Sequence, residues 1–343
     1  MAATLVLISH ARDLLFEDYS GSIWSAPFYV GSGLGHSSVI LFFVLSGFWI
    51  ARTVLRRTAG SPDAFWTGYL IDRLSRLWVV LLPALVVGYG LDATGLHFFP
   101  ESYSNDQAYH TARDVAGSMG VVTWIGNVFF QQSLLVDALG SNGPLWSLAF
   151  EFWFYLWFPA LLLAARRPSL WLLSLGMGVM FPQLIGGFAC WLAGAAVAAS
   201  SGFMPVVRRP IVALSSSGVS AAAIFVAGSV ADGPGWAWDF AIAATFALFL
   251  FVLLRAPVRF PAVLMPLARF GSRSSFSLYV IHFPLLLFGV AALGLPRAAF
   301  GAASLGWLAV AVAVCTLVAI GFSNLTEAQT SRVRDWARRR ARL

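Results

Sequence analysis

Apolar residues follow one another in long stretches from the N-terminus to the C-terminus, separated by short polar connections. A helix needs about 20 apolar residues to cross a hydrocarbon layer of ~30 Å, and most of these stretches approach that length. The pattern therefore predicts an all-α, polytopic bundle of about ten transmembrane helices. Their expected ranges are 2–16, 36–51, 74–91, 145–165, 169–184, 186–201, 211–230, 237–254, 275–294 and 302–322. The apolar segment 119–136 is expected to dip into the membrane or lie along its surface, and it is not counted.

The composition excludes an ordinary water-soluble protein. Hydrophobic residues make up 59% of the chain and charged residues 11%, against about 25% charged residues in soluble domains. Residues 1–325 are expected to form one transmembrane domain, and residues 326–343 a basic cytoplasmic tail. The first stretch leads into Arg12 and Asp13 without a small-residue cleavage site, so it is expected to be a short spanning helix and not a cleaved signal.

Arginine is distributed unequally between alternate connections. The formal net charge is +7, and every one of the 22 basic residues is Arg. Nineteen of them fall in one set of connections and the tail, whereas the opposite connections hold only Arg113 and Arg297, and Arg12 ends the first stretch. By the positive-inside rule both termini are expected in the cytoplasm. The arginines of the tail are expected to contact anionic lipid head groups and not nucleic acid.

The two cysteines, Cys190 and Cys315, both lie inside apolar stretches. They are interpreted as small core residues, because neither a disulfide framework nor a cysteine-based metal cluster fits that placement. No bound metal is expected in this protein.

Three ionisable side chains lie inside apolar stretches, namely His10, Glu151 and His282. Such groups are costly in a membrane, so each is a candidate for a functional site. A neutral imidazole at His10 can accept a proton from a hydroxyl or attack an acyl group, and the alternative is a structural histidine bonded to a neighbouring helix. His282 shares a similar helix face with Ser275 and Tyr279, a pattern that is more often packing between helices than catalysis.

Glu151 is expected about six residues into a span entered from the external side, ~9 Å deep, where a carboxyl must be paired or protonated. Trp146, Ser147 and Tyr155 stand at spacings that place them with Glu151 on roughly one helix face. The aromatic residues alone would indicate a belt at the membrane–water interface. Such a belt does not account for an acid inside the helix, which indicates a functional site instead.

Arg73 and Arg76 stand one helical turn apart at the mouth of the third stretch. Two guanidiniums on one face suit phosphate binding, and the alternative is that they only anchor the helix at the cytoplasmic side. Ser46 and Gly47, in an aromatic helix, allow another helix to approach closely.

Four segments in order give the chain a family resemblance. They are FFVLSGFWIAR at 42–52, the Arg73 and Arg76 pair, LWSLAFEFWFYLWFP at 145–159 and SSFSLYVIHFPL at 274–285. Together they resemble the acyltransferase-3 family, membrane-bound O-acyltransferases of bacterial surface glycans, over nearly the whole chain. In that family the first helix carries an Arg, ten further residues and an essential His. His10 matches the His, while the Arg position falls just before Met1, so the true start is expected upstream.

The resemblance implies an O-acyltransferase of the bacterial inner membrane. Its donor would be a cytoplasmic acyl-CoA, expected to be acetyl-CoA, with phosphates near Arg73 and Arg76. The acceptor would be a hydroxyl of an extracytoplasmic glycan such as exopolysaccharide, lipopolysaccharide O-antigen or Nod factor. His10 would serve as base or transient acyl carrier and Glu151 as a second catalytic residue.

Further residues are expected to bind substrate. Trp146 and Tyr155 would stack on sugar rings, and the remaining candidates of the same site are Ser147, Tyr279 and His282. Two other functions stay open. A transporter or flippase of a lipid-linked saccharide would also use intramembrane charges, although no internal repeat is visible, and a non-catalytic scaffold would tolerate loss of each buried polar residue.

Overall fold

The computed structural model describes residues 2–57, 62–104, 114–164, 167, 169–200, 209–228, 235–256 and 274–341. Over these residues the chain is all-helical and forms no strand, as the sequence predicts. Its helices are α1 (Ala2–Leu15), α2 (Ala26–Ser32), α3 (Gly35–Arg57), α4 (Pro62–Phe98), α5 (Pro100–Ser104), α7 (Val121–Val128), α8 (Trp146–Ala164), α9 (Ser169–Met180), α10 (Gln183–Ala199), α11 (Pro210–Ala227), α12 (Gly235–Arg255), α14 (Ser275–Ala292), α15 (Ala302–Leu325) and α16 (Thr330–Arg340).

Seven helical segments of the described chain are long and apolar enough to cross a membrane, and the number rises to eight if the bent pair α9 and α10 counts as one span. The expected count of about ten is therefore not confirmed. Helix α1 has only 14 residues, and α9 meets α10 at 119°. This break falls at Phe181 and Pro182, because a residue before proline is driven out of the helical conformation.

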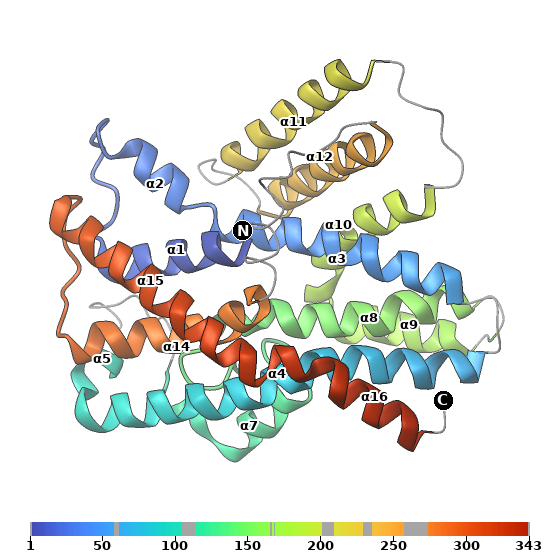
Figure 1. The fold of residues 1–343 in the computed structure, drawn as a ribbon, viewed down its shortest axis with the longest axis horizontal. Helices are drawn as coiled ribbons and strands as arrows, with labels where there is room; N and C mark the ends of the chain where they lie inside the picture. The colour runs from blue at the N-terminus through green and yellow to red at the C-terminus, as the bar shows by residue number, and fades with distance from the viewer. Residues whose placement is uncertain are drawn as a thin grey trace.

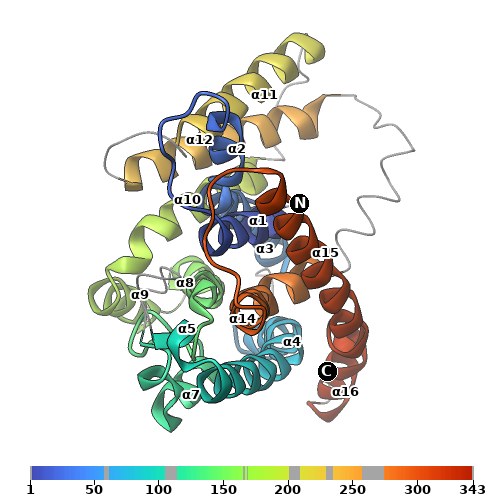
Figure 2. The same cartoon turned by 90° about the vertical axis from the view of Figure 1, so that its left-hand side faces the viewer.

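The long helices run along one axis of the molecule. In Figure 1, α3, α4, α8, α14 and α15 follow the horizontal axis, with α2 near the left end and α16 near the right end. We name these the α2 end and the α16 end. Figure 2 looks along this axis from the α2 end and shows α1 and α3 near the centre, with α11 and α12 packed together on one side. The central α1 packs against α3, α14 and α15.

Glycines let two central helices approach closely. A Cβ at Gly47 of α3 would overlap the backbone carbonyl of Trp191, and a Cβ at Gly194 of α10 would overlap the carbonyl of Val44. Small residues at such crossings allow van der Waals contact between backbones, which drives helix association in lipid. The predicted close approach at Ser46 and Gly47 is thus made by α10.

The apolar segment 119–136 contains α7, which has only 8 residues and does not cross the molecule. It lies against two long helices through indole hydrogen bonds. Trp78 of α4 donates to the carbonyl of Val128 at 2.8 Å, and Trp153 of α8 donates to the carbonyl of Phe130 at 3.0 Å. The helix of this segment is therefore too short to cross a membrane.

The basic tail is partly folded as α16. Arg338 donates to both carboxylate oxygens of Asp72 on α4, at 2.7 and 2.8 Å. Just before α16, Glu327 accepts hydrogen bonds from the amide and the hydroxyl of Ser277 at the start of α14. These contacts hold the tail against the α16 end of the bundle. Some arginines used for the orientation prediction lie outside the described residues, namely Arg113, Arg166, Arg208, Arg259, Arg269, Arg273 and Arg342.

Candidate functional site

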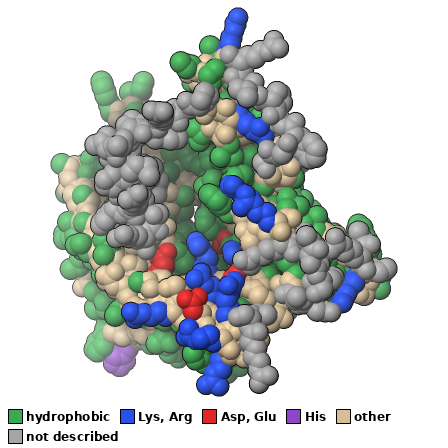
Figure 3. Space-filling model, turned by 45° about the vertical axis from the view of Figure 1, so that its right-hand side comes forward, with side chains coloured by type: hydrophobic (Ala, Val, Ile, Leu, Met, Phe, Trp, Pro, Cys, Tyr) green, Lys and Arg blue, Asp and Glu red, His purple; other side chains and the backbone are tan. Residues whose placement is uncertain are grey.

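A cavity of about 860 Å³ lies among α1, α3, α4, α8 and α14. It unites six of the nine predicted site residues, which are Arg73, Arg76, Ser147, Glu151, Tyr155 and Tyr279. Figure 3 looks toward the α16 end and shows a hollow with arginine side chains gathered around it together with acidic ones. Hydrophobic side chains of α1 and α3, among them Val6 and Phe42, complete the wall.

Glu151 is the buried acid of this cavity, with only 4% of its surface exposed. Its carboxylate accepts a hydrogen bond from the Ser46 hydroxyl at 2.8 Å and another from the Tyr155 hydroxyl one turn along α8. Trp191 donates in turn to the Ser46 oxygen at 3.3 Å. The sequence expectation that a carboxyl at this depth needs partners is met by two hydroxyl donors, a pairing that offsets the cost of burial.

Arg73 lies between two tyrosine rings. Its guanidinium carbon is 5.7 Å from the ring centre of Tyr69 and 5.9 Å from that of Tyr155, distances at which cation–π attraction operates. The Tyr69 hydroxyl donates to the backbone carbonyl of Tyr155 at 2.9 Å, which ties the ring of Tyr69 to α8. The buried Nε of Arg73 has no hydrogen-bond partner among the described residues. Arg76, one turn further along α4, is exposed. The guanidinium of Arg73 is thus held between two rings, and that of Arg76 is accessible.

Tyr279 and Ser147 join α14 to the start of α8. The Tyr279 hydroxyl donates to the Pro144 carbonyl at 2.7 Å, so the 2.5 Å contact between the two hydroxyls is donated by Ser147. Asn142 adds a hydrogen bond to the carbonyl of Val280 at 2.8 Å. The segment before α8 is therefore fastened to α14, which fixes this wall of the cavity.

His10 and His282 form a stacked pair. Their ring centres are 5.3 Å apart and the planes differ by 29°, while the ring of Phe283 meets that of His10 edge-on at 5.2 Å. The Nδ1 of His282 lies 2.7 Å from the carbonyl of Tyr279. That nitrogen must carry the proton, which leaves the buried Nε2 as an acceptor without a partner in the described chain.

The histidine pair lies next to the cavity and not in its wall. Neither ring lines the cavity, but Val6 and Tyr279, one helical turn before His10 and His282, both do. The Tyr279 and His282 ring centres are 5.9 Å apart. The sequence singled out each histidine separately, yet it held no signal that α1 and α14 would stack them.

Trp146 stands apart from the other candidates, because it does not line the cavity. Its ring stacks on His36 at 6.3 Å and meets Phe43 and Phe150 edge-on at 6.1 and 5.2 Å. This packing between α3 and α8 accounts for the tryptophan without a ligand. Its role in sugar stacking stays a prediction.

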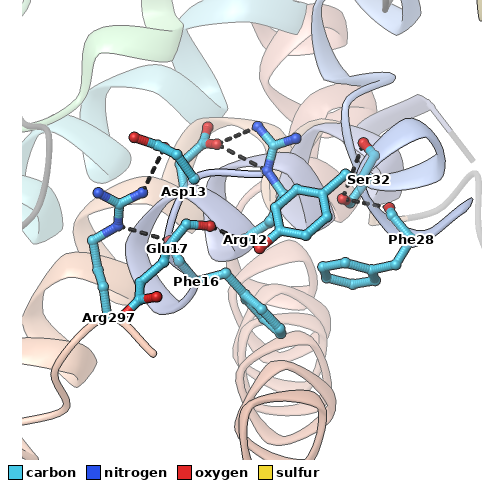
Figure 4. Close-up of polar contacts among 9 residues, drawn as sticks. Arg12, Asp13, Phe16, Glu17, Phe28, Ser32 and Arg297 are labelled. Carbon is cyan, nitrogen blue, oxygen red and sulfur yellow. Dashed lines mark hydrogen bonds and ion pairs between the residues drawn. The ribbon is translucent and has the colours of Figure 1, made fainter. Parts of the chain in front are cut away.

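A second pocket, of about 400 Å³, lies at the other end of α1. Arg12, Asp13 and Glu17 contribute to its lining, with Tyr29 from α2 and Arg297 from the connection between α14 and α15. Figure 4 shows the two arginines reaching toward the end of α1, where Arg12 pairs with Asp13. None of these residues was predicted as a site residue, since they come together from α1, α2 and two connections that are far apart in the sequence. Within the described residues no group of three or more His, Cys, Asp or Glu side chains could hold a metal ion.

Comparison with known proteins relates the chain to acyl transfer. An O-acetyl transferase of Shigella phage Sf6 is 29% identical over 165 residues, which cover 46% of this chain and 41% of the phage protein. The chain thus spans less than half the length of this curated relative. No solved structure matches the chain. The family described as an acyltransferase domain matches residues 1–323, and the chain therefore belongs to the acyltransferase-3 family.

Proposed function

We propose that this chain is an O-acyltransferase that carries an acyl group, expected to be acetyl, across the bacterial inner membrane to a surface glycan. The observation that carries the proposal is the arrangement on α1, where His10 lies between Val6, which lines the cavity of about 860 Å³, and Arg12 and Asp13, which line the pocket of about 400 Å³. A transfer between two compartments needs a reactive group placed between a donor site and an acceptor site, and α1 carries His10 at that position. Family membership and the phage relative named an O-acetyl transferase support the chemistry.

In this proposal the donor is an acyl-CoA that enters the cavity from the cytoplasm, where both termini are expected to lie. Arg73 and Arg76 bind its phosphates, because guanidinium groups suit phosphate oxygens. The buried Nε of Arg73 is a donor without a partner in the described residues, which suits a bound anion. The mostly apolar walls of the cavity, such as Val6 and Leu77, accept the uncharged arm of the donor.

The chemical step uses His10. As a base, its imidazole removes the proton of the acceptor hydroxyl, the hydroxyl oxygen bonds to the thioester carbonyl carbon, and the carbon–sulfur bond breaks. The coenzyme A thiolate then takes the proton that His10 holds. As a carrier, His10 would first accept the acyl group and release the thiol, after which the hydroxyl attacks the acyl-imidazole. Stacking on His282 and the edge-on contact with Phe283 hold the ring in place for either route.

Glu151 assists from within the cavity by holding Ser46 and Tyr155 in position. Tyr155 in turn flanks Arg73, so the acid organises the side of the cavity that binds the donor phosphates. The carboxylate of Glu151 needs no acceptor hydroxyl as a partner, because both hydroxyls bound to it come from the protein.

The test compares the parent strain, a gene-deletion strain and the deletion strain complemented with the gene. NMR of each surface polysaccharide should show O-acetyl signals that disappear in the deletion strain and return on complementation. Membranes from the parent should also transfer labelled acetyl from acetyl-CoA to polysaccharide purified from the deletion strain. Unchanged O-acetylation with an altered amount of surface polysaccharide would instead favour the transporter or flippase.

A further inference from the structure

The pocket of about 400 Å³ at the α2 end has firm walls, although connections build part of it. The amide of Glu17 donates to the carbonyl of Ala298, and the amide of Ala298 donates to the carbonyl of Leu15, both at 3.0 Å. Arg297 donates to the carbonyl of Phe16 at 2.7 Å. The connection between α14 and α15 is thereby fastened to the end of α1, so the pocket keeps its shape without a ligand.

Aromatic rings form another side of this pocket. The rings of Tyr19 and Tyr29 are 5.3 Å apart at their centres, and both residues line the pocket. The Tyr29 hydroxyl donates to the carbonyl of Glu17 at 2.8 Å, which fixes that ring. Tyrosine offers an apolar face together with a polar tip, a combination that suits a ring carrying both C–H and hydroxyl groups.

The charges of the pocket favour a neutral ligand. Arg12 pairs with Asp13, and Arg297 pairs with Asp18 at 2.8 Å, so both arginines are already neutralised. The exposed carboxylate of Glu17 has no side-chain partner among the described residues. A pocket with one unpaired carboxylate accepts hydrogen bonds from hydroxyls and repels an anion.

The position of the pocket relates it to His10. Asp13 follows His10 by three residues on α1, which places the two on neighbouring positions of one helix face. The cavity that would hold the donor touches the same helix at Ala2, Ala3 and Val6, on the other side of His10. The pocket thus begins within one helical turn of the proposed base. The pocket volume lies in the range of about 300–1,000 Å³ usual for small-ligand sites.

We infer that this pocket is the acceptor subsite and that it binds an uncharged sugar segment of the glycan, with Glu17 accepting hydrogen bonds from its hydroxyls. This inference rests on the proposed function. It adds the residues that bind the acceptor and the preference of the site for an acceptor segment without charge. An anionic segment, such as one built of uronic acids, is disfavoured by the unpaired carboxylate.

The experiment uses membranes that contain the full chain, labelled acetyl-CoA and polysaccharide purified from the gene-deletion strain. Glu17→Gln keeps the size of the side chain and removes its charge. It should raise the KM for polysaccharide about tenfold, as loss of one charge-assisted hydrogen bond does, with the KM for acetyl-CoA unchanged. Glu101→Gln, an exposed acid of α5 outside the pocket, is the matched control and should match the parent.

A second variant tests the charge selection. Glu17→Lys should improve transfer to a carboxylated form of the same polysaccharide relative to the neutral form. An unchanged polysaccharide KM in Glu17→Gln, or an equal rise in the acetyl-CoA KM, would overturn the acceptor subsite. Absence of any transfer by parent membranes would instead overturn the proposed function, so the two failures are distinguishable.

Discussion

The cavity of about 860 Å³ and the pocket of about 400 Å³ are built in different ways. The cavity is walled by the faces of long helices and holds a buried acid, Glu151, whose partners also come from helices. The pocket is walled by helix ends, by connections and by ion pairs that water reaches. One such pair joins Arg297 to Asp18, whose side chain is 82% exposed. Because the side chains around the cavity are buried, substitutions that change their shape should have large effects, whereas substitutions at the exposed ion pairs of the pocket should have small ones.

The largest expected effect concerns the residue between the two regions. His10→Ala should lower acyl transfer by about 10²–10⁴-fold, the contribution of a general base, while the protein stays in the membrane. Labelled transfer from acetyl-CoA to polysaccharide measures it. His97→Ala, an exposed histidine at the end of α4, serves as control. Transfer by His10→Ala at the rate of the control variant would remove His10 from the mechanism.

A smaller effect is expected within the cavity at Arg73. Arg73→Lys keeps the positive charge but loses the planar group that lies between Tyr69 and Tyr155. The KM for acetyl-CoA should rise about tenfold, and the KM for polysaccharide should not change. Arg334→Lys on α16 should alter neither. If the polysaccharide KM rose instead, the assignment of donor and acceptor to the two regions would be reversed.

Helical periodicity predicted that Trp146, Ser147, Glu151 and Tyr155 share roughly one face of a helix. Ser147, Glu151 and Tyr155 stand four residues apart and all three line the cavity, because side chains at that spacing share a helix face, whereas Trp146 does not line it. Arg73 and Arg76 follow the same rule on α4. The all-α fold was likewise predictable from the length of the apolar stretches, although α9 and α10, expected as two spans, meet at a sharp bend.

Contacts between distant segments could not be predicted in the same way. The stacking of His10 on His282 depends on how α1 packs against α14, and no local pattern encodes that. The pairing of Ser46 with Glu151 depends on the crossing of α3 and α8. The pocket of about 400 Å³ went unrecognised because its residues come from α1, α2 and the two connections that follow α1 and α14, which no single periodic pattern brings together.

Helix packing around the cavity gives the next prediction. Gly194→Ala places a Cβ against the backbone of α3 and should lower the free energy of unfolding by about 1–3 kcal/mol. Gly186→Ala, on the same helix with open space around it, should be neutral or stabilising by up to about 1 kcal/mol. Thermal unfolding of both purified variants in detergent measures the difference. Equal stability would contradict the close approach of α3 and α10.

The smallest effect on stability is expected at the α2 end. Arg297→Gln removes the ion pair with Asp18 but keeps a donor for the carbonyl of Phe16. An ion pair with such an exposed partner is worth about 0–1 kcal/mol, so the unfolding temperature should fall less than in Gly194→Ala. The polysaccharide KM should rise a few-fold while the acetyl-CoA KM stays constant. A loss of stability as large as that of Gly194→Ala would mean that the connections of the pocket, and not only the helices of the cavity, hold the bundle together.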